Sequence, residues 1–84
     1  MDEEIGRVLG YFAVSQAAVI DLHTGSLRIG DRIWFRGKTT DHLETVCSLQ
    51  LDRKPVSEAA AKRQVGIQVS AKVRRNDRVY RISA

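Results

Sequence analysis

The chain has 84 residues, of which 43% are hydrophobic and 29% are charged, which is enough for one core in a single domain over residues 1–84. A single cysteine excludes an internal disulfide, and no apolar run approaches the length of a membrane span. With the acidic start MDEEIG, which is unlike a signal peptide, these features predict a cytoplasmic protein.

The net charge of +4 is unevenly distributed along the chain. Residues 1–52 carry five basic and eight acidic side chains, whereas residues 53–84 carry nine basic and two acidic ones. A basic half attracts polyanions, although a solvated basic surface explains the same excess equally well.

Alternating apolar residues predict six β-strands, near residues 5–12, 17–22, 32–36, 40–51, 65–69 and 78–82. Within the fourth of these, Val46 is out of phase with Leu49 and Leu51, and we expect a β-bulge to restore the register. Pro55 is expected to end the ladder because it has no N–H to donate.

Residues 57–63 begin with an N-capping serine and continue with good helix formers, which predicts a short helical turn. Six short strands leave the fewest unpaired edges when the sheet closes on itself. The sequence therefore predicts an all-β fold, a six-stranded closed barrel with one helical turn.

Five segments in order carry a resemblance to a known family: IGRV, GSLRIGDRIWFRG, TTDHLETVCSLQLDRKPV, VGIQV and NDRVYRI. Together they resemble the translational β-barrel family, the second domain of elongation factor Tu and initiation factor two, and most of all its small free-standing members. Similar barrels also occur at the C-terminus of U32-type peptidases, some of which act in RNA modification. The resemblance covers about residues 5–82 and implies the same closed barrel.

In the large translation factors this barrel docks on the ribosome and cradles the aminoacylated end of tRNA. Their glutamate that packs on the terminal adenosine is replaced by Cys47 here, and their glycine and acidic residue before the fifth strand by residues 63–64, Arg-Gln. We therefore do not expect the tRNA-end pocket of the large factors in this chain.

A nucleotide site is not expected. The sequence Gly37-Lys38-Thr39 resembles the end of a P-loop, but a P-loop has another glycine five residues before Gly37, where this chain has Arg32. The residues that follow read as a strand rather than a helix, so a turn explains the motif better.

Metal and catalytic sites are not expected either. His23 and His42 are far apart, and one cysteine cannot complete a zinc set with them. Cys47 in an apolar strand reads as a core or near-core side chain rather than a nucleophile. Asp41 and Glu44 should point to opposite faces of their strand. We predict no enzyme, no metal and no cofactor.

One strand face offers a candidate binding surface. Arg32, Trp34 and Arg36 share it, whereas Ile33 and Phe35 point to the interior. A tryptophan between two arginines supplies a stacking plane and two phosphate-binding groups for single-stranded nucleic acid. Two alternatives remain open. The arginine stems cover the indole by cation–π packing on a surface that binds no partner, or the tryptophan anchors a protein interface.

A second basic patch surrounds the last predicted turn, and it contains Lys72, Arg74, Arg75 and Arg78, with Arg81 nearby in sequence. Such a turn suits a phosphate backbone, or it protects a strand edge. The predicted function is a non-catalytic module that binds RNA or a ribonucleoprotein, with tRNA, rRNA or the ribosome as partner. The alternative is a protein-interaction barrel that docks on a larger translation or RNA-modification partner.

Overall fold

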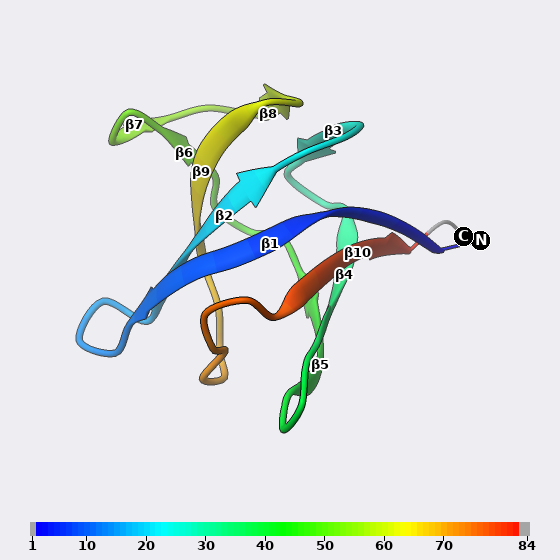
Figure 1. Cartoon of the computed structure of the whole chain (residues 1–84). Coiled ribbons are helices and arrows are strands. Elements are labelled where there is room, and N and C mark those ends of the chain that lie inside the picture. The colour runs from blue at the N-terminus through cyan, green and yellow to red at the C-terminus, as the bar shows by residue number, and fades with distance from the viewer. Residues whose placement is uncertain (1, 83–84) are drawn as a thin grey trace.

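The computed structural model describes residues 2–82, and every regular element among them is a β-strand (Figure 1). The first five strands are β1 (Asp2–Phe12), β2 (Ala17–Leu22), β3 (Ser26–Arg28), β4 (Arg32–Arg36) and β5 (Asp41–Thr45). The remaining five are β6 (Gln50–Leu51), β7 (Lys54–Pro55), β8 (Glu58–Ala60), β9 (Arg63–Gln68) and β10 (Arg78–Ile82). None of the described residues belongs to a helix that could span a membrane.

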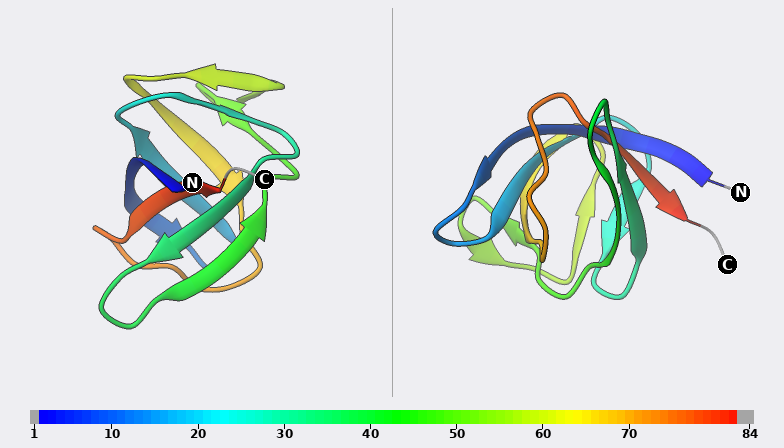
Figure 2. Two further views of the ribbon diagram at one scale, coloured as in Figure 1. Left: turned by 90° about the vertical axis from the view of Figure 1, so that its right-hand side faces the viewer. Right: turned by 90° about the horizontal axis from the view of Figure 1, so that it is seen from below.

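The strands form one large and one small antiparallel sheet. The large sheet has the order β5-β4-β10-β1-β2-β9-β6-β7, and β3 pairs with β8 in the small one. Figure 2 shows the large sheet curling around the interior of the molecule. The all-β prediction is therefore confirmed.

The predicted closed six-stranded barrel is not found, because the two edges of the large sheet, β5 and β7, do not pair with each other. The chain leaves the ladder after Thr45, and β6 then joins β9 through a single pair, Gln50 and Gly66. The predicted strand over 40–51 is thus two short strands. Residues 46–49 between them are irregular, and this lets Val46 and Leu49, each 1% exposed, both point inward.

One further prediction was wrong. The expected helical turn over 57–63 contains β8, in which Ala59 is 3% exposed opposite Leu27 of β3, so burial in the core outweighs local helix propensity. Pro55 lies opposite Gln50 as the last residue of β7, so the pairing reaches the proline and ends there as expected. A proline fits there because β7 is an edge strand and needs no N–H on its free side.

One cluster of hydrophobic side chains fills the interior, with sixteen buried members among the described residues. Ile33 and Phe35 of β4 belong to it and are fully buried, as the alternation in the sequence predicted. Their burial fixes the direction of the side chains between them, which point to the outside of the sheet.

Candidate functional site

Three apolar side chains lie side by side on the outer surface of the large sheet. Trp34 of β4 is directly opposite Leu43 of β5 on one side and Tyr80 of β10 on the other. The rings of Trp34 and Tyr80 are 5.5 Å apart between centroids, and Leu43 is 51% exposed. We call Leu43, Trp34 and Tyr80 the aromatic face. Only its central residue, Trp34, is evident from the sequence, because strand register brings the other two beside it.

Polar contacts hold Trp34 in place. Its indole Nε1 donates a hydrogen bond of 2.6 Å to Oδ1 of Asp41, and the Cζ atom of Arg36 lies 5.1 Å from the ring centroid. Arg36 is therefore placed for a cation–π interaction, one of the arrangements that the sequence left open. The indole remains half-buried and keeps part of its surface in solvent.

The structure joins the two predicted basic patches through Arg78. This residue lies directly opposite Arg36 in the pairing of β10 with β4. The hydroxyl of Tyr80, followed by the charge of Glu4, holds the pKa of the Arg78 guanidinium above its ordinary value. Arg78 thus stays charged beside the aromatic face.

The remaining basic residues of the second patch lie beyond that end of β4. Asp77 accepts a hydrogen bond of 2.8 Å from the backbone N–H of Arg74 and packs against Gly37, so the turn rests on the end of β4. Lys72, Arg74 and Arg75 are exposed on the segment between β9 and β10. Their predicted role in binding nucleic acid stays a prediction.

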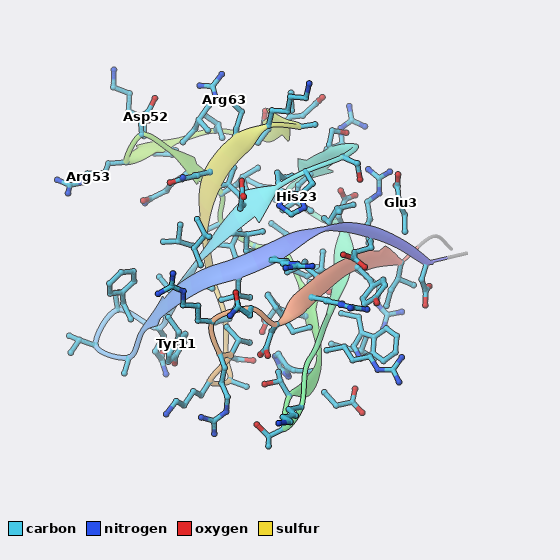
Figure 3. All side chains as sticks on the ribbon, in the orientation of Figure 1. Glu3, Tyr11, His23, Asp52, Arg53 and Arg63 are labelled. Carbon is cyan, nitrogen blue, oxygen red and sulfur yellow. The ribbon has the colours of Figure 1, made fainter. Side chains whose placement is uncertain are left out.

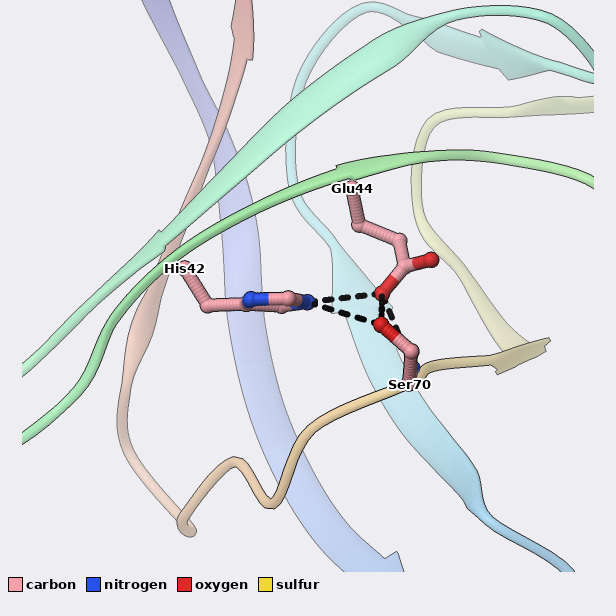
Figure 4. Close-up of polar contacts among 3 residues, drawn as sticks. All are labelled: His42, Glu44 and Ser70. Atoms are coloured by element: carbon pink, nitrogen blue, oxygen red, sulfur yellow. Dashed lines mark hydrogen bonds and ion pairs between the residues drawn. The ribbon is translucent and has the colours of Figure 1, made fainter.

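A histidine, a carboxylate and a serine meet at a second place, on the inner side of β5 (Figure 4). Nε2 of His42 is 2.7 Å from Oε1 of Glu44 and 3.4 Å from Oγ of Ser70. The same carboxylate oxygen accepts hydrogen bonds from the Ser70 hydroxyl at 3.0 Å and the Ser70 backbone N–H at 2.9 Å. The cluster ties β5 to the segment after β9.

These three residues are not arranged as a nucleophile with its base. A carboxylate oxygen can only accept, so the short contact with Glu44 requires Nε2 of His42 to carry the proton. A serine nucleophile needs that nitrogen free to take its own proton. Here the Ser70 hydroxyl donates to Glu44 instead, so the geometry holds two segments together and does not activate the serine.

Burial alone would raise the pKa of the Glu44 carboxyl. The Ser70 backbone N–H, the His42 side chain and the Ser70 hydroxyl more than offset this effect, so the pKa lies below its ordinary value. From the sequence, His42 was considered only as a metal ligand, and Ser70 was not among the candidates. The spacing of His42 and Glu44 puts both on one strand face, but Ser70 comes from a distant segment, and no local pattern indicates it.

The other candidate residues do not assemble into a site. Cys47 is exposed, contrary to the near-core position expected for it, because its neighbours Val46 and Leu49 take the inward positions. His23 contacts Asp21 at 3.1 Å on the surface. Within residues 2–82 no three histidine, cysteine or acidic side chains are grouped so that they could hold a metal ion.

The curated proteins to which this chain is similar are named as a protease and as a collagenase. No known family profile matches the chain. An uncharacterized protease of Methanocaldococcus jannaschii is 41% identical over 78 residues, which cover 92% of this chain and 19% of that protein. A collagenase of Porphyromonas gingivalis is 31% identical over 78 residues, which cover 92% of this chain and 22% of that protein. The chain therefore spans about a fifth of the length of these curated relatives.

Among solved structures, the C-terminal domain of a Geobacillus thermoleovorans protein described as a U32 peptidase has the same fold. The TM-score is 0.87 at 18% identity, and the match covers 96% of this chain and 93% of that one. These comparisons agree with the predicted resemblance to the C-terminal barrels of U32-type peptidases. They give no support to the resemblance to the translational β-barrel family.

These findings correct the functional prediction. Relatives named as protease and collagenase, and a fold shared with a peptidase C-terminal domain, contradict a translation-related RNA-binding module. They also conflict with the prediction of no enzyme, since the relatives are named as enzymes. The structural likeness, however, is to a C-terminal domain alone.

Proposed function

We propose that this chain is a non-catalytic accessory domain of a U32-type peptidase, and that its aromatic face binds polypeptide. The observation that carries the proposal is the extent of the similarity: nearly the whole chain aligns with only about a fifth of each protein named as a protease or collagenase. The catalytic residues of such a protein then lie in the remaining four fifths.

The polar clusters of this chain support a role without catalysis. The cluster of Ser70, His42 and Glu44 combines a serine, a histidine and a carboxylate. In it the Ser70 hydroxyl donates its proton to Glu44 and not to His42. A carboxylate whose pKa lies below its ordinary value is a weak base, so the Ser70 hydroxyl bonded to Glu44 is poorly activated as a nucleophile.

The surroundings of the aromatic face indicate which polypeptides would bind. Tryptophan, tyrosine and arginine are the residues that most often anchor interfaces. Arg32, Arg36 and Arg78 flank the aromatic face along β4 and β10. Of the acidic side chains beside it, Asp41 accepts the indole N–H, and Glu4, opposite Tyr80 on β1, is close enough for its charge to act on Arg78. Charge complementarity therefore favours an extended segment that carries apolar and acidic side chains.

Trp34 is the single tryptophan of the chain and reports on this surface directly. We would titrate the protein with two tryptophan-free dodecapeptides, one alternating phenylalanine with aspartate and the other alternating phenylalanine with lysine. We expect saturable changes in Trp34 emission with the acidic peptide, binding about tenfold weaker with the basic one, and both peptides intact by mass spectrometry afterwards.

Two variants separate the aromatic face from other exposed aromatic surface. Tyr80→Ala should weaken binding of the acidic peptide about tenfold or more, as loss of an interface anchor does. Phe12→Ala removes an aromatic side chain that is 57% exposed at the β1–β2 hairpin, and it should leave binding unchanged. Peptide cleavage, or no response to either peptide, would contradict the proposal.

A further inference from the structure

A pocket of about 580 Å³ lies next to the aromatic face. Its lining includes Arg28, Asp31, Arg32, Glu58, Arg81 and Ile82. Arg32 and Ile82 are partners across β4 and β10, two residues along from Trp34 and Tyr80 on the same strands. Because alternate residues of a strand share a face, Arg32 and Ile82 lie on the same face of the sheet as Trp34 and Tyr80, and the pocket adjoins the aromatic face at that end of the two strands.

Two of the three arginines in this pocket are committed to partners. Arg28 pairs with Glu58 at 3.2 Å. Arg81 donates to the backbone oxygen of Ser26 and to Oε1 of Glu3, each at 2.7 Å, and its side chain is only 29% exposed. These bonds fix the walls of the pocket and bridge the small sheet to the large one.

The third arginine has a different environment. Arg32 is exposed, and in the part of the chain that the structure describes its guanidinium makes no hydrogen bond or ion pair. The nearest acidic residue in sequence, Asp31, accepts a hydrogen bond of 2.9 Å from the backbone N–H of Arg28. Among residues 2–82, Arg32 thus supplies a guanidinium of the pocket that has no polar partner, and a guanidinium binds carboxylates through two parallel hydrogen bonds.

We propose that this pocket binds a carboxylate of the polypeptide that occupies the aromatic face, with Arg32 as the group that recognises it. The inference rests on the proposed function and names the chemistry of its ligand. Trp34 and Arg32 are two residues apart on a strand, about 6.6 Å, which is also the spacing of alternate residues in an extended peptide. A bound segment would place an apolar side chain on Trp34 and a carboxylate at Arg32.

The carboxylate has two sources, an acidic side chain or the C-terminus of a peptide, and three peptides distinguish them. The first is acetyl-Gly-Gly-Phe-Gly-Asp-Gly-amide, the second has Asn in place of Asp, and the third is acetyl-Gly-Gly-Phe-Gly-Gly with a free carboxylate. Trp34 emission follows binding of each. We expect the Asn peptide to bind about tenfold more weakly than at least one carboxylate peptide, and the stronger of those two identifies the source.

Substitution of the guanidinium tests the assignment to Arg32. Arg32→Gln should remove the preference for carboxylate while the Asn peptide binds as before. Arg53→Gln is the matched control, because Figure 3 shows Arg53 on the β6–β7 hairpin, away from the Glu3 side of the molecule, and it should retain the full preference.

The outcomes separate this inference from the proposed function. If all three peptides bind the wild-type protein equally well, the carboxylate site is wrong and the polypeptide-binding function stands. If the preference for carboxylate persists in Arg32→Gln, Arg32 is not the group that recognises it. If no peptide binds, or only a single-stranded RNA hexamer changes Trp34 emission, both proposals are wrong.

Discussion

Gly37 shows how closely the turn before β10 packs on the end of β4. A Cβ atom at this position would collide with Oδ1 of Asp77 and lie 2.7 Å from its Cγ. Asp77 is 5% exposed and accepts the backbone N–H of Arg74, so it cannot move away without losing that bond.

We therefore expect Gly37→Ala to lower the free energy of unfolding by about 1–3 kcal/mol. Gly10→Ala is the matched control, since a Cβ there would meet nothing within 4 Å, and its effect should stay within about 0.5 kcal/mol. Urea denaturation followed by Trp34 fluorescence measures both variants. Equal effects of the two substitutions would mean that Asp77 does not pack against Gly37 as described.

Glu44 makes stability depend on pH in a defined direction. Its folded-state pKa is lowered, so the ionised carboxylate stabilises the fold above the unfolded pKa of about 4.3. This contribution is lost as the pH falls through the folded-state value. Glu44→Gln removes it, so the variant should be less stable than wild type near pH 6, by about 1 kcal/mol.

The difference between wild type and Glu44→Gln should shrink as the pH falls from about 6 to about 3, since wild-type Glu44 becomes neutral as well. Free energies of unfolding from urea titrations across that range measure it. Asp52→Asn, at a side chain that is 88% exposed, should show little difference at any of these pH values. A difference for Glu44→Gln that stays constant with pH would contradict the role of its charge.

At the scale of elements, the sequence predicted strands well where the apolar pattern is local and regular. The expected ranges 17–22, 32–36 and 78–82 agree with β2, β4 and β10. Strands β3, β7 and β8 were not predicted, because two or three residues carry no periodicity. β8 exists because it pairs with β3 across more than thirty residues of chain, for example Ala59 with Leu27.

The candidate sites were likewise predictable from the sequence only where the pattern lies within one strand. The shared face of Arg32, Trp34 and Arg36 follows from alternation within one strand, and so does the inward direction of Ile33 and Phe35. Strand register decides the rest. It brings Tyr80 and Leu43 against Trp34, and Arg78 against Arg36. Register depends on the whole sheet, and the irregular segment over 46–49 shows how one interruption also keeps the sheet from closing.

For the whole molecule, the question is whether the small sheet folds together with the large one. Leu27 of β3 and Ala59 of β8 belong to the same core cluster as Phe35 of β4 and Ile20 of β2. Arg81 of β10 also bonds the backbone oxygen of Ser26 in β3. A shared core and a bond between the sheets predict one cooperative transition, as small single domains usually show.

Leu27→Ala tests this cooperativity, because it removes a fully buried side chain in the small sheet while Trp34 reports from the large one. The loss of core packing should cost about 2–5 kcal/mol and shift the unfolding transitions of Trp34 fluorescence and far-UV circular dichroism together. Ile29→Ala, at a side chain that is 49% exposed just after β3, should shift both far less. A Trp34 transition that stays in place while circular dichroism gains a separate early step would mean that β3 and β8 unfold independently of the large sheet.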